Sequence, residues 1–340
     1  MFDIVTIGSA TRDVFLRAEG FELREHTDSP TGIEQCFPFG SKIEVKEITF
    51  ATGGGGTNTA VTFARQGLKT ACICLVAGDI AGNEILAELK KEGVDTSNFQ
   101  IKKDGRTAYS VVLVHPNAER TILSYKGEGQ HISSEIPFEK IKTKWLFLDS
   151  LGGNYDLLEK AVLWAKENNI KIATNPGGKE LAHGLEKLKI LLESAEVVIM
   201  NREEAGQLTG IDYRKEKEIF EFMDGIVGGV FVMTKGPDGI IISDGKNIYN
   251  AGVPDSPVIE RTGAGDSWSS GFVSEFIKQQ GLKAESRELK ATIAKAIQFA
   301  TANASSVVTK VGAKAGILKK GDWGPWPLVS VELKAKSSSS

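Results

Sequence analysis

The segment RTGAGDSWSSGF, residues 261–272, places three small residues, one carboxylate and the start of an apolar helical stripe in that order. Gly263, Ala264 and Gly265 are therefore expected to form a tight turn at a helix N-terminus, where unpaired N–H groups and the helix dipole attract an anion. Asp266 either caps that helix or accepts a proton beside the anion. Amides aimed at a phosphoryl group, next to a carboxylate that takes a hydroxyl proton, are what phosphoryl transfer to an alcohol requires.

A second glycine cluster, ATGGGGTNTAVTFARQG at residues 51–67, lies between a predicted strand and a predicted helix. It fails the dinucleotide fingerprint, because Asn58 and Thr59 stand where a glycine is needed, and it lacks the Gly-Lys-Ser/Thr of a P-loop. The cluster is either a plain strand-to-helix turn or a bare backbone, at Gly53 and Gly54, that a polyhydroxyl ligand can approach. In the second case the Asn58 amide can both donate to the ligand and accept from it.

Composition argues against several other classes of function. The 340-residue chain has a net charge of −3, which gives no reason to expect a nucleic-acid or membrane partner. No apolar run approaches the roughly 18 residues of a membrane span. The odd number of cysteines, without a CxxC pattern, and a strand-like first segment, MFDIVTIG, predict reduced thiols and a cytoplasmic protein. The four histidines show neither metal-site nor triad spacing, so hydrolase chemistry lacks its usual base.

Short β-branched runs alternate with longer amphipathic stretches along most of the chain. The expected strands are FDIVTIG, KTACICLVAG, KWLFLDS, IKIATNP, EVVIMN and VFVMTKG, with another at 258–260 before the glycine turn. This alternation predicts an α/β fold, a mostly parallel sheet with helices on both sides. Residues 14–52 and 105–126 break the rhythm and are expected to pair as a small extra sheet, the second as a hairpin that turns at Pro116–Asn117.

Both glycine segments resemble signatures of the ribokinase-like family of sugar and nucleoside kinases, also called phosphofructokinase-B type carbohydrate kinases. GDIAGNEILAELKKEGVDTSNF, NREEAGQLTG, TKGPDG and NASSVVTKVGAKAG also occur in the family's order, so the resemblance covers nearly the whole chain. It implies a three-layer α/β/α sandwich with a single kinase domain over residues 1–330. The segments at about 14–52 and 105–126 would form a β lid over the sugar, which excludes water. Residues 331–340 are expected to be a polar C-terminal tail.

The resemblance assigns roles to the two glycine segments. Asp266 matches the family's catalytic base, and the turn at Gly263–Gly265 matches its anion hole. Asp13, just after the first strand, matches the carboxylate that grips substrate hydroxyls, and an ionised carboxylate accepts two hydroxyl hydrogen bonds at once. The other positions that match sugar contacts are Gly53, Gly54 and Asn58.

ATP and Mg²⁺ are the implied cofactors. Asn201 and Glu204 match an Asn-x-x-Glu motif whose glutamate orders magnesium-bound water near the phosphates. The same spacing is that of a capping box, and both interpretations stand. The remaining implied nucleotide contacts are Thr234 and Gly236 at the phosphates and ribose, and Asn303 and Gly312 at the adenine pocket. The implied partners are ATP and a small-molecule acceptor, and the family also allows a homodimer through the β lid.

Several residues depart from the family pattern. Glu260 and Arg261 stand where relatives often have an acidic residue and a threonine, and Gly55 stands where a ribokinase proper has a lysine. Many relatives bind K⁺ beside the anion hole through carbonyls and that acidic side chain. Glu260 keeps the negative charge, but the fixed positive charge of Arg261 predicts weak or absent activation by K⁺. Lys235, next to the phosphate positions, either neutralises phosphates or is merely solvated.

These patterns do not identify the acceptor. The sequence predicts an ATP-dependent kinase of a sugar or sugar derivative. A nucleoside is the alternative acceptor, with its base held by Tyr109, Phe37 or Phe39. A regulator that only binds sugar needs neither Asp266 nor an anion hole, and an NAD-binding enzyme needs the missing fingerprint.

Overall fold

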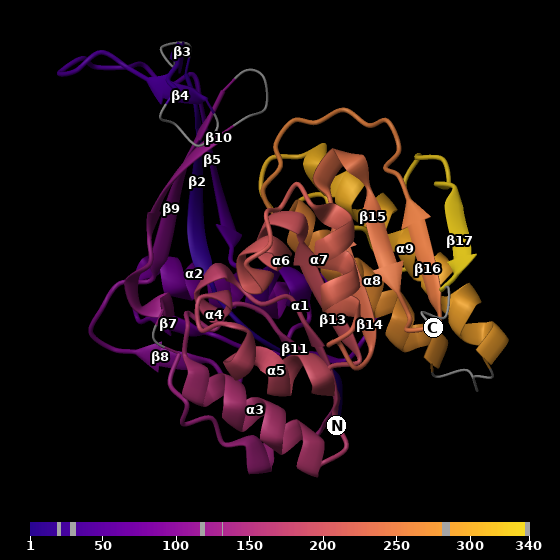
Figure 1. The fold of residues 1–340 in the computed structure, drawn as a ribbon. Coiled ribbons are helices and arrows are strands. Elements are labelled where there is room, and N and C mark those ends of the chain that lie inside the picture. Colours follow the sequence, from indigo (N-terminus) through magenta and orange to yellow (C-terminus); the bar gives the residue numbers. More distant parts are fainter. Residues whose placement is uncertain (19–21, 28–31, 116–119, 131, 281–285, 337–340) are drawn as a thin grey trace.

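A nine-stranded sheet forms the centre of the protein in a computed structural model that describes residues 1–18, 22–27, 32–115, 120–130, 132–280 and 286–336 (Figure 1). In spatial order the strands are β17 (Val331–Ala335), β16 (Asn247–Ala251), β15 (Ile240–Ser243), β14 (Val230–Thr234), β13 (Val197–Asn201), β12 (Lys171–Thr174), β11 (Thr143–Leu148), β1 (Phe2–Ile7) and β6 (Thr70–Ile73). The strands from β6 to β14 pair in parallel, and β15, β16 and β17 add antiparallel strands at one edge. The predicted mostly parallel sheet is confirmed.

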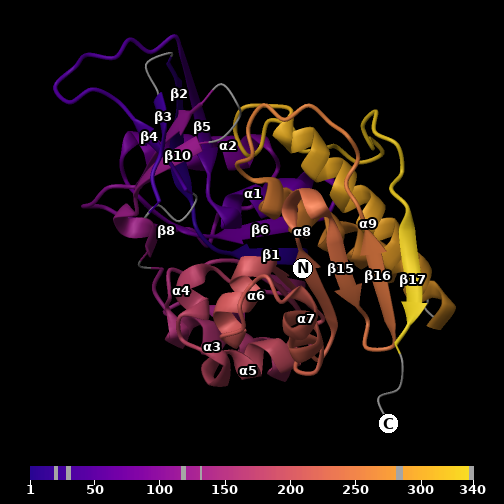
Figure 2. The same cartoon turned by 45° about the horizontal axis from the view of Figure 1, so that its top comes forward.

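Helices cover both faces of this sheet (Figure 2). Alternation along β1 shows why: Ile4 packs with α1, α8 and α9, whereas Val5 packs with α3, α5, α6 and α7. On the first side lie α1 (Gly55–Arg65), α8 (Ala264–Gln280) and α9 (Ser286–Val308); on the second lie α3 (Tyr155–Glu167), α4 (Gly178–Leu181), α5 (Leu185–Ser194), α6 (Arg202–Thr209) and α7 (Glu216–Asp224). The expected three-layer sandwich is confirmed. No helix in the described part is long and apolar enough to cross a membrane.

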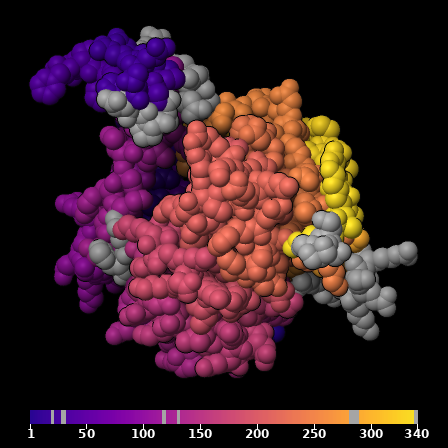
Figure 3. All heavy atoms as spheres, viewed as in Figure 1, coloured from indigo at the N-terminus to yellow at the C-terminus, as the bar shows by residue number. Residues whose placement is uncertain are grey.

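A separate four-stranded sheet stands beside the sandwich and is called the second sheet below. Its order is β10 (Arg120–Tyr125), β9 (Ala108–Val114), β2 (Thr11–Arg17) and β5 (Glu47–Gly53), with β2 and β9 parallel and the other pairs antiparallel. The two irregular segments therefore pair as expected, although the sheet starts at Thr11, and the hairpin turn at Pro116–Asn117 lies outside the described residues. In Figure 3 this sheet projects from the body, and the surface is hollowed beneath it.

One helix and two short pairs of strands lie outside the two larger sheets. The helix α2 (Ile80–Lys91) packs against β2 at the base of the second sheet. The strands β3 (Glu22–Glu25) and β4 (Ile33–Cys36) form a short hairpin, and β7 (Leu75–Ala77) pairs in parallel with β8 (Gln100–Lys102).

Two expectations of local structure are corrected. Residues 331–335 of the predicted tail form β17, because the edge of β16 offers a ladder on which Tyr249 pairs with Leu333; residues 337–340 lie outside the described part. Residues 258–260 form no strand. The backbone N–H groups of Ile259 and Glu260 both donate to the carbonyl of Val308, at 2.8 and 3.2 Å, so the end of α9 holds this segment instead of a sheet.

Candidate active site

The predicted acceptor and phosphoryl-transfer residues gather where the parallel strands end, the usual ligand position in an open α/β sheet. A hydrogen bond between Asn58 on α1 and Asp266 on α8 joins the two glycine segments: the Asn58 Nδ2 donates to Asp266 Oδ2 at 2.7 Å. Asn58 is buried, and its Oδ1 has no hydrogen-bond partner among the described residues. Burial raises the pKa of Asp266, while the bond from Asn58 and the charge of Lys314 lower it.

Asp13 lies over the glycine cluster at residues 51–67. Its carboxylate is buried and accepts from the Thr11 hydroxyl at 3.0 Å. A Cβ at Gly53 would clash with Asp13 Oδ2, so only glycine leaves room for the carboxylate there. Gly54 has φ +93°, and a Cβ there would clash with the Ser9 carbonyl. The two glycines therefore let Asp13 and the backbone of Ser9, between β1 and β2, approach the start of α1.

Asp149 is a site residue that sequence reasoning missed. It follows β11, is buried, and accepts from the Ser150 N–H at 2.7 Å. Burial, together with repulsion by Asp266, raises its pKa well above the usual range. A Cβ at Gly55 would clash with this carboxylate, so Asp149 fills the room that the missing lysine leaves. The available signal was an acidic residue at the carboxyl end of a buried strand, in KWLFLDS.

Lys314 is a second residue that the sequence did not single out. Its side chain is 4% exposed, and its Nζ donates to the Thr52 hydroxyl at 2.6 Å and lies 3.9 Å from Glu88. Its charge lowers the pKa of both Asp13 and Asp266, against the raising effect of their burial. A buried cation thus offsets the negative charge of the two carboxylates, and a lone lysine among the small residues of VGAKAG was its signal.

The predicted anion hole begins α8. The left-handed residue of the turn is Gly263, with φ +79°, and a Cβ there would clash with Ala313. Helix α8 starts at Ala264, so the amides of its first turn lack intrahelical acceptors. A Cβ at Gly265 would meet no atom within 4 Å. Gly263 therefore shapes the turn, whereas Gly265 leaves open space in front of it.

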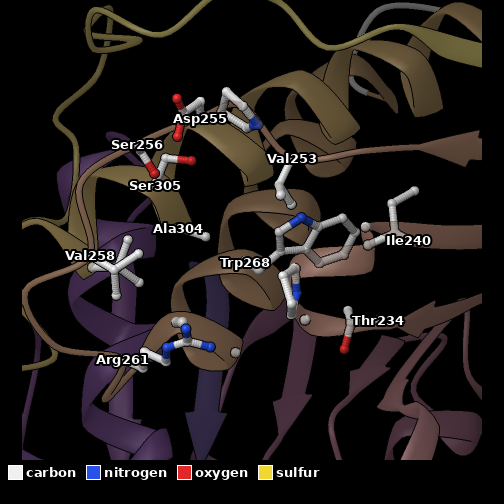
Figure 4. Close-up of a pocket in the computed structure, with 17 residues that line it drawn as sticks. Thr234, Ile240, Val253, Asp255, Ser256, Val258, Arg261, Trp268, Ala304 and Ser305 are labelled. Carbon is white, nitrogen blue, oxygen red and sulfur yellow. The ribbon is translucent and has the colours of Figure 1, made fainter. Parts of the chain in front are cut away.

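That space opens into a cavity of about 510 Å³ (Figure 4). Its apolar wall includes Trp268, Val253 and Ile240, and Thr234 and Gly236 line it at the end of β14. Arg261 also lines the cavity and lies near the glycine turn, apart from Asp255 and Ser256 at the other end. An apolar slot that leads to an arginine and helix amides fits a nucleotide, with the base in the slot and the phosphates at the amides.

Internal contacts involve three residues that the sequence placed at or near the nucleotide, namely the predicted adenine-pocket positions Asn303 and Gly312, and Lys235. Asn303 is buried between α8 and the chain after α9, where it donates to the Ser267 carbonyl at 2.8 Å and accepts from the Leu318 N–H at 2.9 Å. Gly312 (φ +92°) faces Ala51 and Phe15 of the second sheet. Lys235 pairs with Glu216 at 2.9 Å instead of being solvated. Asn303 and Gly312 are absent from the cavity lining, because internal contacts use them.

Asn201 and Glu204 form the capping box of α6. The Asn201 Oδ1 accepts from the Glu204 N–H at 2.7 Å, and Glu204 Oε2 accepts from the Asn201 N–H at 2.8 Å. Burial raises the pKa of Glu204, and repulsion by Asp266 adds to this effect. No group of three or more His, Cys, Asp or Glu side chains in the described residues is arranged to hold a metal ion.

The three aromatic residues considered for a nucleoside base do not assemble around Asp13. In the paired strands β2 and β9, Asp13 is opposite Ser110 and Arg12 is opposite Tyr109. Because side chains alternate between faces, Tyr109 points away from the Asp13 face. Phe37 and Phe39 are 51% and 108% exposed. The structure thus provides no aromatic slot from these three residues beside Asp13.

Gly265→Ala is expected to keep the fold but lower kcat/KM for ATP by about 10²-fold, because the added methyl group occupies the open space before the turn. Gly263→Ala, the matched variant, should instead lower stability by about 1–2 kcal/mol, since it forces a left-handed alanine against Ala313. Thermal unfolding and ATP titrations of both variants check this. Normal activity in a folded Gly265→Ala protein would place the anion hole elsewhere.

Lys314→Met is expected to move the acid limb of the kcat profile to higher pH. Asp266 must be ionised to accept a proton, and loss of the Lys314 charge raises its pKa further. The control is Lys278→Met. Lys278 is a half-buried lysine of α8 and lies about 18 Å along the helix from Asp266. The profile of this control should match that of the wild type, and a Lys314→Met profile that matches it too would contradict the electrostatic role.

Comparison with known proteins agrees with this geometry. The profile of the pfkB family carbohydrate kinases matches residues 1–320. The chain is 27% identical over 286 residues to a ribokinase from Haemophilus influenzae, covering 82% of this chain and 88% of that protein. It is 24% identical over 282 residues to a nucleoside kinase from Methanothermobacter thermautotrophicus, covering 82% and 85%. The structure of a ribokinase from Giardia lamblia superposes with a TM-score of 0.74 at 19% identity, covering 94% and 97%.

These matches confirm the ribokinase-like fold and the expected class of enzyme, an ATP-dependent phosphotransferase whose acceptor is an alcohol group of a sugar or nucleoside. Because the family profile spans nearly the whole chain, this protein belongs to the pfkB family of carbohydrate kinases.

Proposed function

We propose that this protein transfers the γ-phosphoryl group of ATP to a hydroxyl of a free sugar or sugar derivative, with Asp266 as the general base. The observation that carries the proposal is the 2.7 Å hydrogen bond from Asn58 to Asp266. This bond holds the Asp266 carboxylate between the glycine cluster at residues 51–67 and the turn at Gly263–Gly265. A base in that position is within reach of an acceptor hydroxyl on one side and of a phosphoryl group on the other.

Residues described above can carry out each step of the transfer. Asp13 and Asp149 accept hydrogen bonds from acceptor hydroxyls, and Asn58 orients Asp266. Asp266 takes the proton of the attacking hydroxyl, and its raised pKa makes it a better base than an exposed aspartate. The first-turn amides of α8 and the guanidinium of Arg261 stabilise the charge on the transferring phosphoryl group. The second sheet acts as the lid that excludes water from the acceptor.

ATP and Mg²⁺ fit the chemistry of this edge. The cavity lined by Trp268 would hold the base, with the phosphates toward Gly265 and Arg261. Mg²⁺ keeps several waters and is held chiefly by phosphates, so the lack of a ready-made cluster of three side-chain ligands in the described residues does not oppose it. Glu204 would hold a magnesium-bound water. When bound, Mg²⁺ would supply positive charge beside the phosphates, and that charge would also offset the repulsion between Glu204 and Asp266.

A sugar is preferred to a nucleoside because the carboxylates Asp13 and Asp149 suit hydroxyl groups, and Tyr109 faces away from Asp13. The nucleoside kinase among the relatives keeps the second class open. A panel of pentoses, hexoses, ketoses and nucleosides, assayed by ADP release with ATP and Mg²⁺, tests this choice. Sugars should give the highest kcat/KM. Turnover with nucleosides alone would refute the sugar assignment and establish the alternative.

We also propose a cytosolic location and a homodimer through the second sheet. The buried thiols of Cys72 and Cys74 are free and 3.3 Å apart, which suits a reducing compartment. The edge strands β5 and β10 expose apolar side chains that a second copy would cover, namely Ile48, Phe50, Ile122, Leu123 and Tyr125. Sedimentation of the wild type and of Phe50→Ser tests the dimer. A monomeric wild type would exclude it.

A further inference from the structure

Arg120, the first residue of β10, contacts the segment that leads into the glycine turn. Its Nε lies 3.3 Å from Oε1 of Glu260, whose side chain is completely buried. A second arginine of the same sheet, Arg17, donates from Nη2 to the Ile259 carbonyl at 3.4 Å. Two arginines of the second sheet therefore contact the residues just before the predicted anion hole, one at the buried Glu260 carboxylate and one at the Ile259 carbonyl.

Glu260 organises this segment from within. The same Oε1 accepts from the N–H of Thr262 at 2.7 Å and from its hydroxyl at 2.5 Å, and Thr262 directly precedes Gly263. The other oxygen, Oε2, has no hydrogen-bond partner among the described residues, and neither has Arg120 Nε. A buried carboxylate is costly unless a positive charge compensates it, and the guanidinium of Arg120 supplies such a charge here.

We propose that Arg120 is a positioning residue for phosphoryl transfer, which holds the anion-hole segment through Glu260 and takes the place of a monovalent cation there. The proposal rests on the kinase function proposed above. K⁺ does not fit beside Glu260, because a guanidinium already supplies positive charge and like charges a few ångströms apart repel. Weak or absent activation by K⁺ thus stays the prediction, with a different cause: Arg120 meets Glu260, whereas the neighbouring Arg261 lines the nucleotide cavity.

The pair also connects two parts that must cooperate. Arg120 belongs to the sheet that covers the acceptor, and Glu260 belongs to the body that holds the phosphoryl group. The anion-hole segment is therefore fixed by Arg120 only when the second sheet lies over the site. This arrangement ties the position of Gly263 and Gly265 to closure of the sheet, so loss of Arg120 should affect kcat more than the KM for either substrate.

The test compares the wild type, Arg120→Met and the control Arg24→Met, an exposed arginine of β3 that pairs with Glu22. Turnover is measured at equal ionic strength in tetramethylammonium, in K⁺, and in tetramethylammonium with millimolar guanidinium. The wild type and the control should respond to neither added cation. Arg120→Met should lose about 10²-fold in kcat in tetramethylammonium and regain at least tenfold with K⁺ or guanidinium. Wild-type kcat in Arg120→Met, a loss that neither cation reverses, or strong K⁺ activation of the wild type would overturn the proposal.

A second set of variants removes the risk that Arg120→Met does not fold. Arg120→Met with Glu260→Gln removes both charges, so the protein should fold and show the reduced kcat without any response to K⁺. Unfolding midpoints of the two single variants and the double variant give a readout that needs no turnover. The double variant should be no less stable than Arg120→Met, and additive losses would refute the ion pair. If the wild type showed no turnover, the kinase function alone would be refuted. The unfolding midpoints of the three variants would still show whether Arg120 and Glu260 stabilise each other.

Discussion

Asp266→Asn is expected to lower kcat by about 10²–10⁴-fold while the affinity for ATP changes little. The asparagine keeps the size of the side chain and can still accept the hydrogen bond from Asn58, so the geometry at the start of α8 survives. It cannot take a proton from the acceptor. Because burial disfavours the charged form of Asp266, replacement by a neutral amide should not destabilise the fold.

Steady-state kinetics and calorimetry with ATP test this expectation, with Asp244→Asn as the control. Asp244 lies at the turn between β15 and β16, where its carboxylate accepts from Asn247 and Tyr249 of β16, and it does not line the cavity. The control should turn over like the wild type even if its stability falls. If kcat of Asp266→Asn fell by less than tenfold, Asp266 would not be the general base.

Asp13→Ala is expected to raise KM for the acceptor by about 10–150-fold and to leave KM for ATP nearly unchanged. Removal of one charged hydrogen-bonding partner costs about 1.5–3 kcal/mol, and about 1.4 kcal/mol corresponds to tenfold. Asp13 is buried on β2, opposite Ser110 of β9, and it is not among the residues that line the nucleotide cavity. Equal increases in both KM values would place Asp13 outside the acceptor site.

Gly53→Ala provides an independent check on Asp13. The added Cβ would clash with Asp13 Oδ2, so the carboxylate must move away from its present position. The variant should therefore resemble Asp13→Ala in its acceptor KM, although the carboxylate itself is still present. The comparison with Gly252→Ala, where a Cβ meets no atom within 4 Å, separates this local displacement from a general effect of alanine on flexibility.

Local patterns predicted the sandwich and both glycine segments, because strand and helix periodicity and turn chemistry depend on neighbouring residues. FDIVTIG, KWLFLDS and EVVIMN are strands as expected. The strand β17 escaped prediction because only one of its residues is even half-buried, and VELKA carries charges that also suit a tail. Its pairing depends on the free edge of β16, which no local pattern reveals.

Charge relations across the fold were the part that the sequence could not predict. Arg120 forms an ion pair with Glu260, and the charge of Lys314 offsets those of Asp13 and Asp266. These residues are far apart in sequence, and only the fold brings them close together. The sequence analysis assigned the charge that opposes K⁺ to Arg261, because Arg261 directly follows Glu260. Neighbouring residues can point in different directions, however, and Arg261 lines the cavity instead. The contact between Gly55 and the Asp149 carboxylate likewise depends on the folded chain, because the two residues are far apart in sequence.

The most direct test of the account measures two products of one reaction. The wild type is incubated with ATP, Mg²⁺ and the best acceptor of the panel, and ADP and phosphorylated acceptor are quantified together by chromatography and mass spectrometry. The account predicts equal amounts of the two products from the wild type, and a parallel loss of both in Asp266→Asn. ADP release without a phosphorylated acceptor, or phosphorylated acceptor formed at the wild-type rate by Asp266→Asn, would contradict phosphoryl transfer to an alcohol through this carboxylate.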